Sequence, residues 1–439
     1  MKMLDRSKQP EIQEIPFPSL LPIEKRELSN GVEMYVLRGG TQEIVEIDII
    51  TKSGTLFSER GFVARPTADL LGEGAGKYTS KDLASLFDFY GVMVSGSAGT
   101  VTSELTLVGL TKYMDKCLEG VEMIVKNPHF PQKELELYVE TRRQKFLTQM
   151  QKTKYRASRL AKRALFSADS RYSRVLELSD IESLNRDMLQ AFHAKMYIPQ
   201  GAKIIVSGLP DEALLRRIEQ IFGDTWKGGN AIETNLMPSY SDDVKMIFDE
   251  YDAAKQNTIY MTTKMPTMND PDCMYLDILN MVFGGYFGSR LMTNIREEKG
   301  LTYGISSSYS VNNLSGSHVI CSNVKSDMYE LVVDEIWKEM KKLCEQPISK
   351  EELDVVKNYI RGNFLQNFDN VLSVVESYKS LILTGKDMSY YRRRYDVLNN
   401  VTAEDLMRVA QKYYKQENYH VVISGKRKES LYGRQNAAE

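Results

Sequence analysis

The chain has 439 residues, of which 42% are hydrophobic and 26% charged, and its formal net charge at pH 7 is −2. This length predicts two or three domains at about 150 residues each, and the near-neutral charge argues against nucleic acid or an anionic membrane as partner. No apolar run approaches the roughly 20 residues that a membrane helix needs. The opening stretch MKMLDRSKQPEIQEIP lacks the apolar core of a secretory signal, so we expect a cytoplasmic protein.

Cysteine and histidine usage narrows the chemistry further. The four cysteines lie far apart and form no C-x-x-C pair, which is typical of reduced core residues rather than of a disulfide framework. The four histidines are also scattered, and no two of them stand at the spacing of a zinc-ligand pair.

The segment GFVARPTADLLGEGAGKYTS (61–80) has the outline of a helix that should carry chemistry. An apolar run leads in, a proline falls in the expected first turn, and three glycines close the segment before a second helix opens at Thr79 or Ser80. Its middle holds Arg, Pro, Thr and Ala, which neither bind a metal nor transfer a proton. The sequence therefore predicts a helix with a packing role.

A strand is expected at 104–110, and a long basic run follows it. Residues 141–168 contain nine Lys or Arg and no acid: Arg142, Arg143, Lys145, Lys152, Lys154, Arg156, Arg159, Lys162 and Arg163. A solvated helix face is one interpretation, and a basic wall of a peptide chamber or of a partner interface is the other. Nucleic-acid binding is disfavoured because no reader motif accompanies the run.

An internal repeat organises the whole chain. The segments 181–208 and 398–425 match position by position, with Leu184 opposite Val401, Tyr197 opposite Tyr414 and Gly208 opposite Gly425, each pair at the same offset in the numbering (401−184, 414−197 and 425−208 all equal 217). Both copies predict a capped amphipathic helix followed by a short strand that ends in Ser-Gly. A duplication is the simplest explanation.

The repeat sets the expected domain organisation. We expect an N-terminal extension (1–27), a first α+β domain (28–225), a linker rich in Gly, Asn, Pro and Ser (226–246) and a second α+β domain (247–439). Runs of strands followed by runs of helices predict an α+β fold in which each domain packs a mainly antiparallel sheet against helices.

Three stretches then carry a resemblance to a known family. LSNGVEMYVL (28–37) reads as an opening strand pair, GFVARPTADLLGEGAGKYTS follows it, and FGSRLMTNIREEKGLTYGISSSYS (287–310) places Arg296 seven positions before Tyr303. Together they resemble the insulinase/pitrilysin superfamily of zinc peptidases, which includes mitochondrial processing peptidase. The resemblance covers nearly the whole chain and implies two similar domains joined by a linker.

The resemblance implies that the first-half zinc motif, His-x-x-Glu-His, is vacated. In active relatives two His on one helical face hold zinc and a Glu polarises the bound water. Aligned from Gly61, the three slots hold Ala64, Thr67 and Ala68; aligned from Gly74, the preferred alignment, they hold Arg65, Ala68 and Asp69. A third ligand is expected seven positions after a Glu, and there Leu147 follows Glu140. We therefore expect no metal and no cofactor in this chain.

The retained second-half signature implies a role beside a partner. In relatives this Arg and Tyr reach the zinc site and hydrogen-bond the substrate carbonyl, so Arg296 and Tyr303 are the expected catalytic residues, acting in trans. The implied partner is a homologous His-x-x-Glu-His subunit that carries the zinc, the implied substrate is a peptide, and a homodimer is an option without that partner. The alternative is an inert peptide-binding or structural homologue. The glycine-rich stretch 283–291 is interpreted as a tight turn, because it lacks a phosphate-loop pattern.

Overall fold

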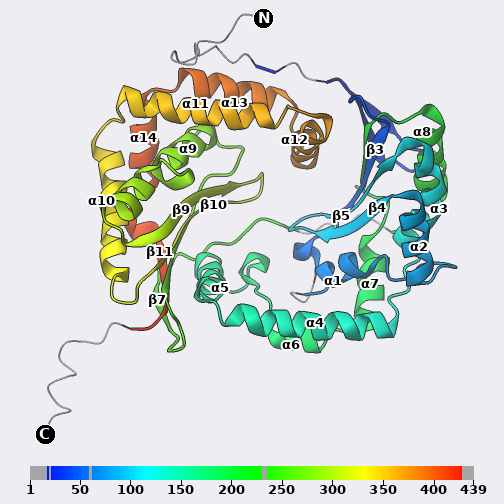
Figure 1. Ribbon diagram of the computed structural model, residues 1–439, viewed down its shortest axis with the longest axis horizontal. Helices are drawn as coiled ribbons and strands as arrows, with labels where there is room; N and C mark the ends of the chain where they lie inside the picture. Colours follow the sequence, from blue (N-terminus) through cyan, green and yellow to red (C-terminus); the bar gives the residue numbers. More distant parts are fainter. Residues whose placement is uncertain (1–16, 19–20, 59–61, 230–234, 428–439) are drawn as a thin grey trace, which may run out of the picture.

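The computed structural model describes residues 17–18, 21–58, 62–229 and 235–427. Its described residues form two mixed sheets packed against helices, which confirms the predicted α+β class (Figure 1). The first sheet has the strand order β1-β2-β6-β3-β5-β4 and the second has the order β7-β11-β8-β10-β9. The strands of the first sheet are β1 (Ile23–Glu27), β2 (Glu33–Arg38), β3 (Ile44–Thr51), β4 (Met93–Ala98), β5 (Ser103–Leu110) and β6 (Lys203–Gly208). Those of the second are β7 (Met246–Glu250), β8 (Asn257–Lys264), β9 (Thr302–Val311), β10 (Gly316–Val324) and β11 (His420–Gly425).

The two sheets share one topology. Each is antiparallel except for one parallel pair, β2 with β6 in the first sheet and β7 with β11 in the second. The repeated segments fold alike, because α7 (Arg186–Met196) and β6 precede α14 (Ala403–Tyr413) and β11 by the offset of the sequence repeat (403−186 and 420−203 both equal 217). The matched sequence patterns therefore form matched elements.

Helices surround both sheets. The other helices of the first half are α1 (Ala64–Leu70), α2 (Ser80–Tyr90), α3 (Thr111–Lys126), α4 (Gln132–Met150), α5 (Thr153–Leu165), α6 (Leu178–Glu182) and α8 (Glu212–Glu219), with the short turns η1 (Thr55–Phe57), η2 (Arg171–Ser173) and η3 (Gln220–Asp224). Those of the second half are α9 (Cys273–Asn280), α10 (Tyr329–Glu345), α11 (Lys350–Gln366), α12 (Val371–Thr384) and α13 (Ser389–Asn400), with η4 (Met281–Gly285), η5 (Met292–Glu298) and η6 (Gln416–Asn418).

Local signals explain where several helices begin and end. The Thr79 hydroxyl accepts from the Asp82 N–H in a capping box that opens α2, and Gly91 closes this helix in the left-handed region. Thr402 and Asp405 form the same box at the start of α14. The start of α2 is the one predicted at Thr79 or Ser80, and α14 is the capped helix predicted in the second copy of the repeat.

Each half lends one helix to the sheet of the other half. Helix α5 packs on the second sheet, where Ala157 and Ala161 contact Val422, and α12 packs on the first sheet, where Val375 contacts the apolar cluster around Ile205. In Figure 1, α5 lies beside β7 and β11 and α12 lies near β3. Both faces of each sheet are thus covered, which explains why β6 and β11 read as continuous apolar runs.

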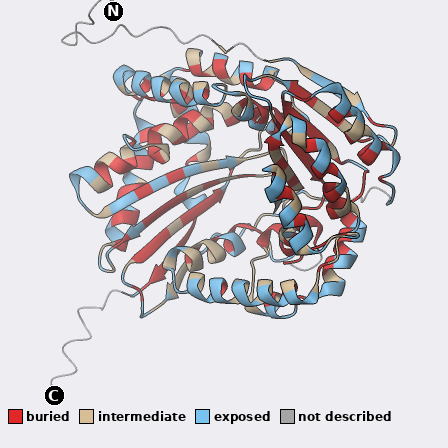
Figure 2. Ribbon diagram, turned by 45° about the vertical axis from the view of Figure 1, so that its right-hand side comes forward, coloured by how far each residue is buried: buried red, intermediate tan, exposed pale blue. Residues whose placement is uncertain are grey.

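Buried residues concentrate on the strands and on the helix faces that are turned toward them, and the outer helix faces are exposed (Figure 2). The first sheet and its own helices enclose one core, and the second sheet and its helices enclose another. Most of the predicted extension (1–16 and 19–20) and the middle of the predicted linker (230–234) lie outside the described residues, so the domain boundaries stay predictions. Among the helices that the structure describes, none combines the length and the apolar character needed to cross a membrane.

Candidate functional site

Helix α1 occupies the place where the resemblance expects a zinc motif. Pro66 lies in its first turn, where a missing N–H costs no hydrogen bond. Ala64, Thr67 and Ala68 are buried, and the Thr67 hydroxyl donates back to the Val63 carbonyl at 2.9 Å. The alignment that starts from Gly61 therefore names residues that only pack.

Of the residues in the preferred alignment, Asp69 contacts α4. The Asp69 carboxylate accepts from Arg65 Nε at 2.9 Å and from the Tyr138 hydroxyl at 2.8 Å, and it also pairs with Arg142. Tyr138 and Arg142 stand four positions apart on α4, so they share one helical face, and the Arg142 guanidinium lies over the Tyr138 ring at 5.0 Å. Burial, and then the charge of Asp69, raises the pKa of the Tyr138 phenol.

This arrangement does not fit zinc. Catalytic zinc takes three protein donors and an open position, whereas these slots offer the one carboxylate of Asp69, already held by two guanidiniums that stay charged at any physiological pH. Tyr138 and Arg142, not Leu147, are the α4 residues that reach Asp69; Leu147 lies five positions after Arg142 and is exposed. Glu140 accepts from Gln144 at 2.8 Å. The charges of Asp69, Arg65 and Arg142 join α1 to α4.

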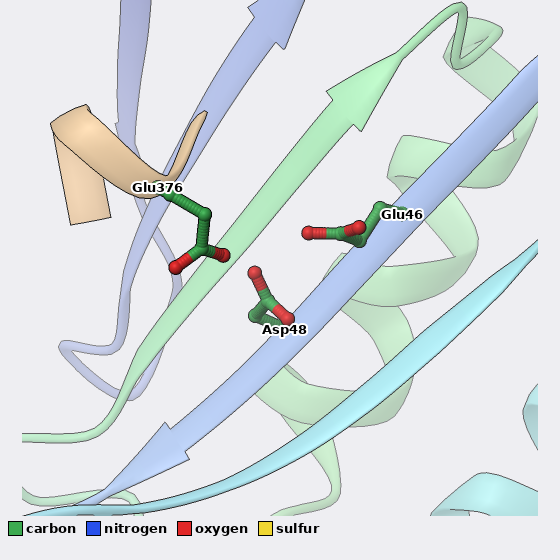
Figure 3. A group of neighbouring side chains, drawn as sticks. All are labelled: Glu46, Asp48 and Glu376. Atoms are coloured by element: carbon green, nitrogen blue, oxygen red, sulfur yellow. The ribbon is translucent and has the colours of Figure 1, made fainter. Parts of the chain in front are cut away.

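A second acidic group invites a metal interpretation and also fails it. Figure 3 shows Glu46 and Asp48 on β3 with Glu376 on α12, and one ligand oxygen from each lies within 4.8 Å of the others. The Lys379 ammonium already lies 2.8 Å from Asp48 Oδ2 and 2.7 Å from Glu376 Oε1. A buried cation therefore takes the place that an ion would occupy, and the cluster joins α12 to the first sheet.

Arg296 and Tyr303, the expected catalytic pair, lie on the second half. Arg296 belongs to η5, half-buried, with its guanidinium 4.7 Å from the centre of the exposed Phe287 ring. Tyr303 is the second residue of β9, and 89% of it is exposed. The glycine-rich stretch 283–291 begins in η4, and its middle residues 286–289 form the turn that leads to η5. The phenol is thus free to contact another molecule.

Residues that sequence reasoning did not single out hold η5 in place. Arg290 forms a two-point ion pair with Glu352 of α11, at 2.8 and 2.7 Å. The buried Asn294 amide donates to Glu339 of α10 at 2.7 Å and to Glu335 at 3.2 Å. Arg290 and Asn294 lie inside the stretch that resembles the family, and this was the only sequence signal that could have singled them out. Their partners Glu352, Glu339 and Glu335 lie on α11 and α10, and no local sequence pattern links them to Arg290 and Asn294.

Most of the basic run at 141–168 is engaged in structural pairs. Arg156 pairs with Asp249 of β7, Arg143 with Glu182, and both Arg159 and Arg163 with Glu177. Carboxylates of the same chain therefore compensate most of the positive charge of this run, and its residues do not form a continuous basic wall.

The comparisons with known proteins agree with this geometry. Residues 183–360 match the family described as the Peptidase M16 inactive domain. An "Uncharacterized zinc protease" of Rickettsia bellii is 23% identical over 403 residues, which cover 90% of this chain and 96% of that one. The "Non-peptidase homolog YmxG" of Helicobacter pylori is 23% identical over 310 residues, 69% of this chain and 70% of that one.

A solved structure shows the same fold. The peptidase M16 inactive domain from Pseudomonas fluorescens has a TM-score of 0.84 at 20% identity, covering 92% of this chain and 98% of that chain. The family match and relatives that span most of the chain confirm the expected resemblance. Residues 183–360 thus match the inactive-type M16 domain, and over most of its length the chain resembles M16 (insulinase/pitrilysin-like) peptidase homologues.

Proposed function

We propose that this chain is the non-metal subunit of a two-chain zinc peptidase that acts on peptides. The observation that carries the proposal is the contrast between the two halves. The first-half slots are closed by the pairs of Asp69 with Arg65 and Arg142, while Tyr303 of the second half is open to solvent. In this proposal the zinc belongs to a homologous partner that bears His-x-x-Glu-His.

The proposed contribution of this chain is two hydrogen-bond donors. The Tyr303 phenol and the Arg296 guanidinium donate to the carbonyl oxygen of a peptide held at the partner's site. The clamps at Arg290 and Asn294 support this role, because a donor stabilises a transition state only when its position is fixed beforehand. Phe287, exposed beside Arg296, offers an apolar contact to the same peptide.

Reconstitution with the partner tests the proposal. Losing one oxyanion donor typically costs about 10²–10³ in turnover, so Tyr303→Phe should lower peptide cleavage by the mixed subunits on that scale while the subunits still associate. Arg296→Ala should also weaken substrate binding. Tyr359→Phe and Arg393→Ala, an exposed tyrosine and an exposed arginine elsewhere on the second half, serve as matched controls. Normal cleavage by both test variants would refute the shared site.

A second candidate is an inert peptide-binding or structural homologue. The name of the Helicobacter pylori relative, a non-peptidase homolog, favours it. Under this candidate the partner cleaves equally well alone, and the isolated chain, as a monomer or homodimer, binds peptides without cleaving them. The cytoplasmic location stays a prediction under both candidates.

A further inference from the structure

A cavity of about 570 Å³ lies between the two halves, away from both α1 and η5. One wall comes from α5, η2 and the residues that follow η2, and the opposite wall comes from β8 and the β9–β10 hairpin. This volume is within the range of small-ligand sites, about 300–1,000 Å³. The function proposed above makes no use of this cavity.

The charge of the lining is one-sided. Among the described residues, four cationic side chains and no carboxylate line the cavity. The four are Arg159, Lys162, Arg171 and Arg174. Arg159 is compensated by Glu177, with Nη2 and Oε2 2.8 Å apart, so the net positive charge comes from the other three.

Arg171 and Arg174 are fixed in place without being neutralised. Arg171 Nη1 donates to the Leu56 carbonyl at 2.5 Å and Arg174 Nη1 donates to the Ser58 carbonyl at 2.6 Å. Each guanidinium has five N–H donors, so most of them remain available. Burial, and then the neighbouring Arg171, lowers the pKa of Arg174. The two guanidiniums therefore repel one another in a partly buried setting that an anion would relieve.

Neutral donors complete the lining. Tyr172 is only 8% exposed, and its hydroxyl lies near the Ser315 side chain but makes no hydrogen bond of normal geometry among the described residues. A buried polar group without a partner costs about 1–3 kcal/mol, so this hydroxyl is a donor in need of an acceptor. The second half adds hydroxyl and amide groups from Thr262, Ser310, Asn312, Ser315 and Ser317.

We propose that this cavity binds a small oxyanion ligand, bearing carboxylate or phosphate groups, through Arg171, Arg174, Lys162 and the Tyr172 hydroxyl. Guanidinium groups bind both oxyanions through paired, charge-assisted hydrogen bonds. These four groups lie on the first half, and the hydroxyl and amide groups of the second half line the opposite wall.

Calorimetric titration of the full chain at low salt tests the site with three probes. The probes are pyrophosphate, the tripeptide N-acetyl-Glu-Glu-Glu and its neutral counterpart N-acetyl-Gln-Gln-Gln. We expect at least one anionic probe to bind, more weakly as salt rises, and the neutral tripeptide not to bind. Binding of the acidic tripeptide alone identifies a carboxylate ligand, and binding of pyrophosphate alone identifies a phosphate ligand. If neither anion binds, the proposal is overturned.

Variants locate the binding. Arg171→Gln with Arg174→Gln should weaken the anion at least tenfold, and Lys162→Gln should weaken it several-fold. Arg186→Gln is the matched control for the arginines, because this exposed arginine also donates to a carbonyl, that of His129, but lies outside the cavity. Lys145→Gln, at an exposed lysine outside the cavity, is the control for Lys162→Gln. If the double variant fails to fold, Lys162→Gln against Lys145→Gln decides. Equal affinity of test and control variants would place the anion elsewhere and overturn the site.

Discussion

Helices α5 and α12 occupy equivalent places in the two halves, yet they hold the opposite sheet by different means. Helix α5 approaches through small residues, Ala157 and Ala161, against Val422. Helix α12 approaches through larger ones, including Val375 and Tyr378. The duplicated architecture is kept while the side chains that make the contact have diverged.

The ionic contacts diverge further. Arg156 of α5 meets Asp249 one to one, at 2.7 and 2.6 Å, and both side chains are partly exposed. Lys379 of α12 instead lies within 2.5–2.8 Å of Asp48, Glu104 and Glu376. Although burial opposes it, the charge of Asp48 then raises the pKa of Lys379. Arg156 and Asp249 are one cation with one carboxylate, whereas Lys379 is one cation among three carboxylates. The contact of α12 with the first sheet therefore depends strongly on the single residue Lys379.

Removing the central cation should give the largest effect. Lys379→Met leaves the carboxylates around it uncompensated, and breaking a buried ion pair from one side costs about 3–5 kcal/mol. We expect a loss near the lower end, about 3 kcal/mol, because Glu376 is largely exposed. Guanidinium unfolding measures it.

Lys341→Met is the control for this prediction, because Lys341 is exposed and its carboxylate partner Glu345 lies 3.7 Å away. Surface substitutions of this kind usually stay within about 0.5 kcal/mol. Equal losses for the two variants would show that the cluster does not hold α12 on the first sheet.

The small side chains of α5 give the next effect. Ala161 is 1% exposed, so Ala161→Leu must push α5 away from β11. Overpacking of this kind costs about 1–3 kcal/mol. The exposed Ala194 of α7 supplies the control, Ala194→Leu. A neutral Ala161→Leu would mean that α5 is loosely seated on the second sheet.

Much of this fold could be predicted from the sequence because its signals are local. The helix start at Thr79, the capped helix and strand in each copy and the internal repeat each depend on residues close in the chain or on a copy of them. The exchange of α5 and α12 could not be predicted in the same way. The consecutive apolar residues in the middle of β6 and β11 indicate that both faces are covered, but they do not say by which helix.

In the candidate site, too, the contiguous features could be predicted from the sequence and the contacts between distant helices could not. The sequence was enough to find the vacated slots at Arg65, Ala68 and Asp69, because the motif is contiguous. It was not enough to find Arg142, which reaches Asp69 from a different helix far along the chain. Arg142 reaches Asp69 because it lies on the face of α4 that is turned toward α1, which the spacing from Glu140 does not indicate. The roles of Arg296 and Tyr303 stay predictions.

Breaking the one-to-one pair should cost less than breaking the cluster. Arg156→Met removes two charge-assisted hydrogen bonds to Asp249, but water reaches this pair and Ser424 still donates to the carboxylate at 2.6 Å. We expect a loss of about 1–2 kcal/mol after allowing for that exposure. Arg427→Met, an exposed arginine 3.5 Å from Glu250, is the control in the same unfolding assay. A loss larger than that of Lys379→Met would reverse the comparison.

The smallest effect is the share of the pH dependence that comes from the α12 cluster, beside the share of the four cysteine thiols, whose pKa burial also raises. Burial, and then Glu104, raises the pKa of Asp48 to about 8, so the folded state keeps a proton that the unfolded chain releases near pH 4. A carboxyl with a raised pKa stabilises the fold at low pH, and that contribution is lost as the pH rises toward and through the folded value. Between pH 7 and 9 we expect a loss on the order of 1 kcal/mol. Lys379 adds nothing to this slope, because its raised pKa takes effect only above about 10.4.

Two variants test whether this proton belongs to the α12 contact, at Asp48, or to the α5 contact, at Arg156. Asp48→Asn, which keeps the shape without the proton, should reduce the loss of unfolding free energy between pH 7 and pH 9 by about 1 kcal/mol and leave the share of the cysteine thiols in place. Arg156→Met should leave that loss unchanged, because Arg156 does not titrate in this range. If native and Asp48→Asn proteins lose the same stability between the two pH values, the proton is not on this cluster and the two helices are held alike.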